Sequence, residues 1–273
     1  MKLLQVIQKT FPKHKYAINA KLLGDSSELA WSNLGLWQGS ENYIVACEQL
    51  AEHLAEQIHL TSTDHVLDLG VGYGASLLYW QKKYHIENIE GVEIQKYCVN
   101  KINQYFNDVV PIYCDSYLNL KHIPFQKKFD AIICIDSAYH SALDLFLDSI
   151  STVLNSKGRV GFHYLARSDV WTEASYIQKV KTTVLLKSAD VHIGEVRSQS
   201  QIIDCLHHFK FQNVEIIDLS EPVFLGFAKY IEEYFQHHQK NLDVFKIKMT
   251  AKLCRKLFEE GLIQYVLVTA QYE

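Results

Sequence analysis

The chain has 273 residues, of which 48% are hydrophobic and 21% charged, and its formal net charge is −4. These values are typical of a globular protein that can bury a large core. The negative charge argues against non-specific nucleic-acid binding, which needs a cationic surface. The sequence contains no apolar run long enough to span a membrane, and residues 1–9 lack the continuous apolar segment of a signal peptide.

The N-terminal part, residues 1–60, is predicted to form a helical lid. One or two short helices are expected before the aromatic-rich segment Trp31–Trp37. Apolar residues at helical spacing then predict a helix from about residue 41 to residue 58, with Ser40 as its candidate N-cap. We expect this lid to lie over the site that the following residues build.

Residues 61–167 are predicted to form the core, because strand and helix patterns alternate there. Strands are expected at residues 65–69, 88–93, 109–113, 130–135 and 159–165. The helices between them are expected at residues 75–84, around Cys98–Phe106 with Tyr105 on the apolar face, and from Leu143 to a stop at Gly158. This order predicts a Rossmann-like, doubly wound, mostly parallel sheet with helices on both faces.

The C-terminal third departs from strict alternation. Residues 168–196 are predicted to be a helical cap insertion, and residues 197–273 to complete a seven-stranded sheet around a second helical insertion at 220–260. Both insertions leave from the carboxyl ends of strands, which is the edge where open α/β sheets bind ligands. Their aromatic residues indicate a partly apolar pocket beneath them.

The six cysteines stand apart, with no Cys-x-x-Cys pair. Cys134 falls within a strand pattern, and Cys98 and Cys205 fall on apolar helix faces. Such positions favour buried free thiols, which persist in a reducing compartment. We therefore expect a cytoplasmic protein.

A glycine-rich turn follows the first core strand in the segment His65–Gly74. Glycine permits positive φ and a close approach of ligand to backbone, and the start of the next helix offers unpaired N–H groups. A nicotinamide-type fingerprint is G-x-G-x-x-G with an acid about 20 residues later. Here Asp68 ends the strand instead, and Gly70, Gly72 and Gly74 alternate.

This pattern resembles the first motif of class I S-adenosylmethionine-dependent methyltransferases, and further landmarks follow in the order of that family. The resemblance implies that Glu93, in Gly91-Val92-Glu93-Ile94, binds the ribose hydroxyls and that Cys114-Asp115-Ser116 lies near the adenine amino group. It also implies that the strand Phe129–Asp136 lies beside the transferred methyl group. It covers about residues 40–165. The predicted cofactor-binding residues are Asp68, Gly70, Gly72, Gly74, Glu93, Ile94, Asp115, Ser116, Asp136, Trp37 and Tyr43.

The segment Asp136-Ser137-Ala138-Tyr139-His140 resembles the corresponding stretch of small-molecule methyltransferases related to the sterol and phosphoethanolamine enzymes. The Pro-Pro-aromatic stretch of exocyclic-amino and glutamine methyltransferases is absent, as is the Pro-Cys of cytosine-C5 enzymes. The spacing of acids and Asn in the metal-dependent catechol branch is also not evident, so no metal is expected. These features predict methyl transfer to an O, N or C atom of a small molecule, without a nucleic-acid partner. No feature of the sequence indicates an oligomeric state.

His140 is the leading candidate for a general base, because its ordinary pKa of about 6.5 suits proton removal near neutral pH. The alternative is that it caps the next helix or bonds to the backbone. Tyr139 is expected either to shape the pocket or to pack. His163 and Tyr164 point to opposite faces of the strand that ends at Leu165, so that one of them could reach the acceptor.

Trp37 and Tyr43 resemble aromatic residues that related enzymes bring over the methionyl end of the cofactor. Attraction between an aromatic face and a sulfonium would support that role, and ordinary packing is the alternative. The pairs His207-His208 and His237-His238 do not indicate metal sites, because adjacent residues of a helix diverge. The basic run Lys246, Lys248, Lys252, Arg255 and Lys256 is interpreted as a solvated helix face, with a charged ligand or partner as the alternative.

Two other functional classes fit the same motifs. One is an enzyme of this fold that performs non-methyl chemistry, such as aminopropyl transfer, cyclisation or a lyase reaction. The other is a non-catalytic protein that keeps the cofactor pocket. A Rossmann-like domain for another nucleotide is a further alternative, which the four landmarks in register disfavour.

Overall fold

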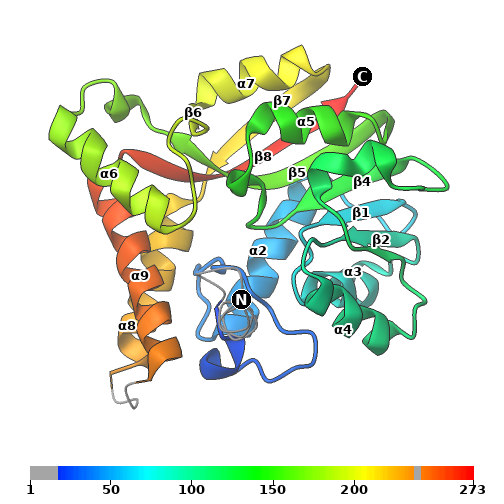
Figure 1. The fold of residues 1–273 in the computed structure, drawn as a ribbon, viewed down its shortest axis with the longest axis horizontal. Coiled ribbons are helices and arrows are strands. Elements are labelled where there is room, and N and C mark those ends of the chain that lie inside the picture. Colours follow the sequence, from blue (N-terminus) through cyan, green and yellow to red (C-terminus); the bar gives the residue numbers. More distant parts are fainter. Residues whose placement is uncertain (1–17, 237–240) are drawn as a thin grey trace, which may run out of the picture.

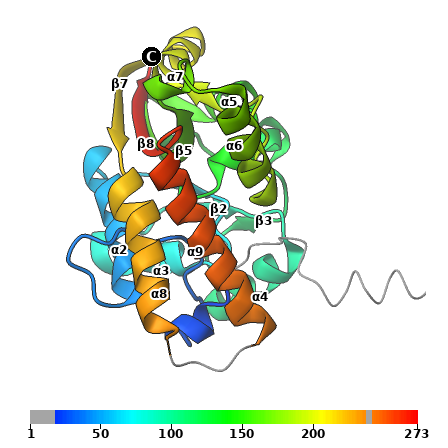
Figure 2. The same cartoon turned by 90° about the vertical axis from the view of Figure 1, so that its left-hand side faces the viewer.

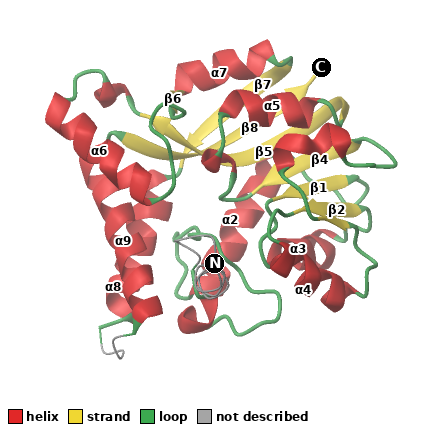
Figure 3. Cartoon of the chain, viewed as in Figure 1, coloured by secondary structure: helices red, strands yellow, loops and turns green. Residues whose placement is uncertain are grey.

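A mostly parallel sheet with helices on both faces organises the chain (Figure 1; Figure 3). The structure is a computed structural model that describes residues 18–236 and 241–273. The strands are β1 Val66–Leu69, β2 Ile89–Val92, β3 Ile112–Tyr113, β4 Phe129–Cys134, β5 Leu154–Arg167, β6 Arg197–Ser198, β7 Phe211–Asp218 and β8 Ile263–Tyr272. Residues 1–17 of the N-terminal part, where one or two short helices were expected, and the pair His237-His238 lie outside the described residues.

The strand order is β3-β2-β1-β4-β5-β8-β7, and the two-residue β6 pairs with β5. Strands β1 to β5 run parallel to one another, whereas β8 is antiparallel to both β5 and β7. The order steps outward from β1 in both directions, so the carboxyl ends of β1 and β4 meet at a crevice of the kind that binds ligands. The predicted Rossmann-like fold is confirmed, with β6 as a short addition.

Helices cover both faces of the sheet. They are α2 Tyr43–Gln57, α3 Ala75–Tyr84, α4 Lys96–Phe106, α5 Leu143–Ser151, α6 Tyr176–Ser188, α7 Gln199–His208, α8 Gly226–Tyr234 and α9 Leu242–Glu260. Short 3₁₀ turns are η1 Ala20–Leu23, η2 Tyr117–His122, η3 Ala138–His140 and η4 Asp169–Trp171, and η5 Glu221–Leu225 is a π-helical turn. Helices α2, α3 and α4 share one apolar core with α8 and α9, while α5 and α7 pack in a second core on the other face.

The sequence of β4 shows why this sheet has two cores. Ala131 and Ile133 belong to the first core, and Ile132 and Cys134 belong to the second. Successive side chains of a strand point to opposite faces, so a strand covered on both sides must be apolar throughout. The continuous apolar run of β4 is therefore a consequence of burial between two helical layers.

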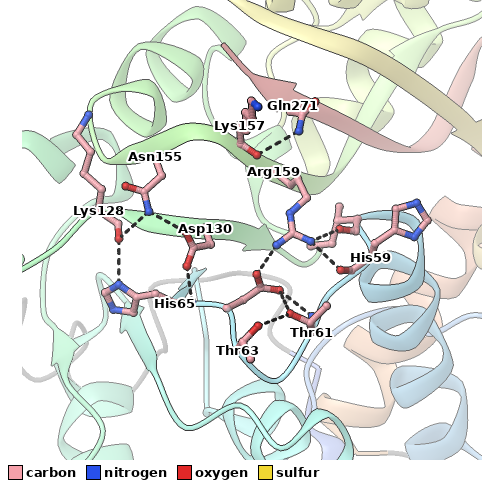
Figure 4. Close-up of polar contacts among 12 residues, drawn as sticks. His59, Thr61, Thr63, His65, Lys128, Asp130, Asn155, Lys157, Arg159 and Gln271 are labelled. Carbon is pink, nitrogen blue, oxygen red and sulfur yellow. Dashed lines mark hydrogen bonds and ion pairs between the residues drawn. The ribbon is translucent and has the colours of Figure 1, made fainter.

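A polar network fixes the amino end of the sheet, away from the glycine turn (Figure 4). The Arg159 guanidinium pairs with Asp64 and donates to the carbonyl oxygens of Ile58 at 2.9 Å and His59 at 2.7 Å. Asp130 accepts from the backbone N–H of His65 at 3.0 Å. These bonds hold the connection between α2 and β1 against β4 and β5, so the chain passes from α2 into the sheet at a fixed position.

Several predicted boundaries were wrong for local reasons. Asn42, not Ser40, caps α2, because its side chain accepts from the Val45 N–H at 3.0 Å while Ser40 bonds to Gln49. Helix α5 ends at Ser151, and β5 begins at Leu154, so Gly158 lies within a strand and stops no helix.

Two exposed side chains were also misplaced by the sequence patterns. Tyr105 is 38% exposed and lies outside the buried face of α4, and Val109 is 79% exposed and precedes the short β3. No helix among the described residues is long and apolar enough to cross a membrane.

His163 is fully buried in β5 and has no described hydrogen-bond partner at either ring nitrogen. Its ring stacks against Tyr265, with ring centroids 5.4 Å apart. Burial, together with the nearby His53, lowers the pKa of His163 to about 3. Tyr164 points to the other face and bonds to the carbonyls of Ser141 and Glu195. The expectation that one of this pair reaches an acceptor was wrong, because neither lines the cavity described below.

The neutral His163 makes stability depend on pH. Its folded-state pKa lies below the ordinary value of about 6.5, so below that value the unfolded chain binds a proton that the folded chain excludes. The His163 contribution is present above about pH 6.5 and is lost as the pH falls toward 3. Between about pH 7.5 and about pH 5.5 we expect His163 to lower the free energy of unfolding by about 1.4 kcal/mol.

Urea unfolding at both pH values tests this expectation in the wild type, His163→Phe and the exposed control His207→Phe. The His163 variant should lose about 1.4 kcal/mol less than the wild type on acidification. The control should match the wild type. An equal pH-dependent loss in all three proteins would contradict the assignment.

Candidate active site

The glycine turn between β1 and α3 has the backbone conformation that only glycine adopts readily. Gly70, Gly72 and Gly74 have φ values of +69°, +55° and +88°. A Cβ atom at Gly70 would lie 2.5 Å from the Ser137 Oγ, and one at Gly74 would lie 2.8 Å from the Ile102 Cγ1. The turn therefore needs glycine both for its conformation and for its close packing.

Glu93 follows β2 and fixes the turn from the side. Its carboxylate is buried and accepts from the backbone N–H of Gly72 at 2.9 Å and of Gln95 at 2.8 Å. Two backbone donors hold the side chain in one orientation at the edge of a cavity. A carboxylate fixed in this way can accept hydrogen bonds from a pair of ligand hydroxyls.

Asp68 and Asp115 occupy positions that differ from those expected. Asp68 lies beneath the turn, where it accepts from the Trp80 Nε1 at 2.9 Å, and burial raises its pKa to about 6. Asp115 accepts from the Ser116 N–H at 2.6 Å and from Asn119 at 3.2 Å. Neither lines the main cavity, whereas Ser116 does. Asp68 therefore holds the Trp80 side chain beneath the turn, and Asp115 holds the backbone at Ser116.

A cavity of about 480 Å³ extends from the glycine turn to the space beneath the caps. This volume lies within the range of about 300–1,000 Å³ that is usual for small-molecule sites. Gly70, Gly72, Glu93, Ile94 and Ser116 line one end. The other end is mostly apolar, although Asp190 and Thr250 also border it. Its apolar residues are Ile18, Leu165, Leu186, Val191, Phe224, Leu253 and Leu257. Figure 2 shows α9 and α6, which supply part of this wall, on the side that faces the viewer.

Asp136 lies where the two ends of the cavity meet, directly after β4. Its Oδ1 accepts from the hydroxyls of Tyr139 at 2.7 Å and Tyr265 at 3.0 Å, and its Oδ2 accepts from the Leu34 N–H at 2.9 Å. Burial raises the pKa of Asp136, and these three donors act in the opposite direction. Asp136, Tyr139 and Tyr265 all line the cavity. No sequence motif marks Tyr265, because it belongs to an otherwise apolar final strand.

His140 lines the same cavity at the end of η3 and is exposed. Its Nδ1 lies 3.5 Å from the carbonyl oxygen of Asp190, and its ring packs against Tyr139 with centroids 4.6 Å apart. A proton on this imidazole would also favour the charged form of Asp136. The candidate base therefore borders the region between the polar and apolar ends.

Trp37 and Tyr43 do not line the cavity, contrary to expectation. The Trp37 ring stacks on Tyr230 with centroids 4.2 Å apart and packs against Gly226, which has no side chain to exclude it. The buried Tyr43 donates its hydroxyl to the Asn33 carbonyl at 2.9 Å. Both aromatic residues anchor the segment whose Ser32, Asn33 and Leu34 form part of the cavity wall.

Eight of the predicted residues thus border one cavity: Gly70, Gly72, Glu93, Ile94, Ser116, Asp136, Tyr139 and His140. The other five, Asp68, Gly74, Asp115, Trp37 and Tyr43, are not on its wall. Gly74 is instead the N-cap of α3. Within residues 18–236 and 241–273, no group of three or more His, Cys, Asp or Glu residues is placed to hold a metal ion.

Comparison with known proteins identifies the core of the chain. The protein family described as "Methyltransferase domain" matches residues 67–162, from β1 into β5. The matched residues include the glycine turn, Glu93 and the Asp136–His140 segment. The donor of this class is S-adenosylmethionine, so the predicted class of domain and its cofactor are confirmed.

Two curated methyltransferases are similar in sequence to this chain. The glycine/sarcosine/dimethylglycine N-methyltransferase of Actinopolyspora halophila is 25% identical over 208 residues, which is 73% of this chain and 35% of that protein. The erythromycin 3''-O-methyltransferase of Saccharopolyspora erythraea is 36% identical over 70 residues, which is 25% of this chain and 23% of that protein. The matches therefore span about a third of the first relative and a quarter of the second.

The fold of the whole chain also has solved counterparts. The geranyl diphosphate C-methyltransferase of Streptomyces coelicolor A3(2), solved with Mg²⁺, geranyl diphosphate and S-adenosyl-L-homocysteine, matches with a TM-score of 0.69. The alignment covers 96% of this chain and 99% of that one at 15% identity. At this identity the likeness shows the fold, which includes the cap segments as well as the methyltransferase domain.

The residues that line the cavity fit S-adenosylmethionine, independently of the similarity to known proteins. The positive-φ glycines bring the backbone of the methyltransferase domain to the cavity, and added Cβ atoms at Gly70 or Gly74 would collide with their neighbours. The fixed Glu93 carboxylate would accept hydrogen bonds from ribose hydroxyls, and Ile94, which is 63% exposed, would offer an apolar surface to an adenine ring. Asp136 and Tyr139 border the region where the sulfonium end would lie.

Replacement of Gly70 by Ala should weaken cofactor binding. The new Cβ would collide with Ser137 and displace the turn, so we expect the affinity for S-adenosylhomocysteine to fall about tenfold or more. Gly39→Ala is the matched control, because Gly39 also has a positive φ of +75° but has nothing within 4 Å of an added Cβ. Isothermal titration should show reduced affinity only for the Gly70 variant, and equal affinities would contradict this role of the turn.

Proposed function

We propose that this chain is an S-adenosylmethionine-dependent methyltransferase whose acceptor is a small, largely apolar molecule. The observation that carries the proposal is one continuous cavity, with the glycine turn and Glu93 at one end and apolar side chains from the caps at the other. The methyltransferase domain supplies the donor site, and the remaining segments supply the acceptor site. The transfer is an in-line displacement to an O, N or C atom.

The charges on the cavity wall narrow the acceptor class. Asp136 and Asp190 border the acceptor end, and none of the described cavity-lining residues is Lys or Arg. Phosphate groups are recognised in proteins chiefly through Arg, Lys or a metal ion. The described wall therefore favours a neutral or cationic acceptor over a diphosphate such as that of the structurally similar C-methyltransferase.

The residues of the chain contribute alignment and exclusion of water, since bound S-adenosylmethionine supplies the electrophilic methyl group. Asp136 holds Tyr139 and Tyr265 in fixed orientations beside the junction of the two cavity ends. Leu34, bonded to the same carboxylate, closes the wall from the N-terminal segment. A site assembled from these three separate segments holds its groups in fixed positions around an acceptor.

His140 is the proposed general base for an acceptor that must lose a proton. It lies on the cavity wall between the polar and the apolar ends, and it is exposed enough to exchange protons with water. The resemblance of residues 136–140 to the sterol and phosphoethanolamine branch supports the same assignment. We place this chain in that branch as part of the proposal.

The proposed organisation follows from the positions of the cavity walls. Residues 1–60 are the lid, residues 61–167 the cofactor-binding core, residues 168–196 a cap insertion, and residues 197–273 the rest of the sheet with the cap insertion 220–260. Residues Leu34, Leu186 and Leu253, which come from the lid and the two caps, all border the cavity. Six free cysteines, five of them buried, support the proposed cytoplasmic location.

Glu93→Gln should weaken S-adenosylhomocysteine binding about tenfold to a hundredfold. The substitution keeps the shape of the side chain but removes the charge that strengthens its hydrogen bonds to ribose. The exposed Glu87→Gln is the matched control. If isothermal titration gave wild-type affinity for the Glu93 variant, the ribose assignment would fail. If the wild type itself bound neither S-adenosylmethionine nor S-adenosylhomocysteine, the proposed function would fail.

Mass analysis of the products tests the reaction itself. We expect an added methyl group on the acceptor and one S-adenosylhomocysteine for each turnover, measured over a panel of apolar amines, alcohols and phenols. Cofactor binding with transfer of an aminopropyl group, or with an isomerised acceptor, would identify the non-methyl alternative. Binding without any turnover of an identified ligand would identify the non-catalytic one.

His140→Gln should lower kcat about a hundredfold or more with a hydroxyl acceptor, because general-base catalysis contributes that much or more. The cofactor affinity should stay unchanged. The wild-type rise of kcat with pH through the histidine range should disappear in the variant. His192→Gln, at an exposed position nearby, is the control. Unchanged kcat in the His140 variant would remove His140 from the mechanism.

A further inference from the structure

The outer faces of α6 and α9 carry an unusual concentration of exposed apolar side chains. Fourteen large hydrophobic residues are exposed among the described residues, and seven of them lie on these two helices. They are Tyr176, Ile177, Val180 and Val184 on α6, and Leu242, Phe245 and Met249 on α9. Both helices lie along the left-hand edge of the molecule in Figure 1, and Figure 2 shows that edge from the front.

The spacing places these residues in continuous stripes. On α6, Ile177, Val180 and Val184 are three and four residues apart, so they lie on one face, opposite the buried Thr182 and Leu186. Ile177 is 66% exposed and Val184 is 63% exposed. A surface helix ordinarily directs polar residues outward, so this face is the reverse of the usual pattern.

Helix α9 repeats the arrangement. Phe245, which is 60% exposed, and Met249 are four residues apart, and Lys252 and Lys256 continue the same line along the helix. The neighbouring face of α9 carries Leu253, which lines the cavity. One helix therefore separates an exposed apolar and basic surface from the interior of the proposed acceptor site.

The charge of these helices opposes that of the whole chain. Helix α6 contains Lys179, Lys181 and Lys187 and no acid, which gives a net charge of +3. Helix α9 contains five basic and three acidic residues, which gives a net charge of +2. The whole chain has a formal net charge of −4. The two helices that expose apolar side chains thus carry a net positive charge, opposite in sign to that of the whole chain.

A hydrogen bond joins the middle of α6 to the C-terminal end of α9. The Thr182 hydroxyl on α6 donates to the Glu260 carboxylate on α9 at 3.0 Å. Strands β5 and β8, which pair antiparallel with Arg167 opposite Ile263, place the following α6 and the preceding α9 at the same end of the sheet. The two stripes therefore belong to one side of a fixed framework.

We propose that this surface, defined by Ile177, Val180 and Val184 on α6 and by Phe245, Met249, Lys252 and Lys256 on α9, docks on an anionic lipid bilayer. Apolar side chains enter the boundary between headgroups and acyl chains, and lysines bind the headgroup phosphates while their stems remain in apolar surroundings. Charge complementarity favours this occupant over an uncharged apolar partner. The inference does not depend on methyl transfer.

The geometry gives this docking a consequence for substrate supply. Leu186 of α6 and Leu253 and Leu257 of α9 line the apolar end of the cavity, while the outer faces of the same helices form the docking surface. A bilayer bound there lies beside the walls of the acceptor chamber. An apolar acceptor that is poorly soluble in water would then enter from the lipid phase.

Vesicle flotation with the full chain tests the proposal. Wild-type protein should bind phosphatidylcholine vesicles that contain phosphatidylglycerol, bind pure phosphatidylcholine vesicles much more weakly, and be released by high salt. Val184→Asp combined with Phe245→Asp should lower the partition coefficient about tenfold or more. Lys252→Glu combined with Lys256→Glu should lower it at least about fivefold, and only with the anionic vesicles.

Matched variants elsewhere on the surface test whether vesicle binding depends on the docking surface itself and not on the overall charge or hydrophobicity of the protein. Val109→Asp combined with Leu145→Asp alters two exposed apolar residues outside the docking surface, and Lys82→Glu combined with Lys127→Glu reverses two exposed lysines there. Both controls should bind vesicles as the wild type does. Unfolding midpoints and S-adenosylhomocysteine affinity, measured on every variant, report that each one is folded.

Three results would overturn the proposal. One is a wild-type chain that does not bind anionic vesicles at low salt. Another is vesicle binding that the Val184 and Phe245 substitutions leave unchanged. The third is a dimer in sedimentation velocity that these substitutions dissociate, without any vesicle binding, since the surface would then contact a second copy. Because the readout is lipid binding, each outcome is independent of whether the chain transfers a methyl group.

Discussion

The half-buried carboxylate of Asp136 is the constraint on which the assembled site depends. A charge removed from water is costly unless hydrogen bonds compensate it, and here the three donors come from Leu34, Tyr139 and Tyr265. Leu34 belongs to the N-terminal segment, and Tyr265 to the last strand. The carboxylate is therefore satisfied only when segments 102 and 129 residues away in sequence have docked. The contacts that complete the cavity wall at Asp136 are therefore also contacts between the N-terminal segment, β4 and β8.

The two ends of the sheet have different roles: one end fixes the framework, and the other end borders the cavity. At its amino end, Arg159 joins Asp64 and the end of α2, so the framework is fixed by charge-assisted bonds away from the chemistry. At its carboxyl end, the glycine turn and Glu93 form the proposed donor site within the matched residues 67–162. The proposed acceptor site also draws on segments outside that match, such as Leu34, Leu186 and Leu253.

The caps have two chemically different faces. The inner faces of α6 and α9 are buried and contribute Leu186, Leu253 and Leu257 to the cavity. Their outer faces expose apolar and basic side chains to the surroundings. Helices that are apolar on two sides are unusual in a globular protein, because the second side gains nothing from the fold. A lipid surface would give that second side its function and would bring an apolar acceptor close to its site.

The sequence by itself determined the core of this protein. Helix α3 begins and ends at the residues that its apolar pattern predicted. The spacing of Gly70, Gly72 and Gly74, together with Glu93, indicated the methyl donor from the sequence alone. These features depend on local physics, namely the period of apolar residues, the φ values open to glycine, and the position of an acid at a strand end. The position of His140 shortly after a predicted strand likewise indicated that it would lie near the cavity, and it lines the cavity wall.

Only the tertiary structure decided which distant residues meet. Tyr265 reaches Asp136 because β8 runs antiparallel beside β5, a pairing that no local pattern encodes. The Trp37 ring packs against Tyr230 and not in the cavity wall, because Gly226 leaves space for it. Asp68 lies beneath the glycine turn, where Trp80 donates a hydrogen bond to it. Each outcome depends on packing between segments far apart in sequence, where residue type alone does not specify the partner.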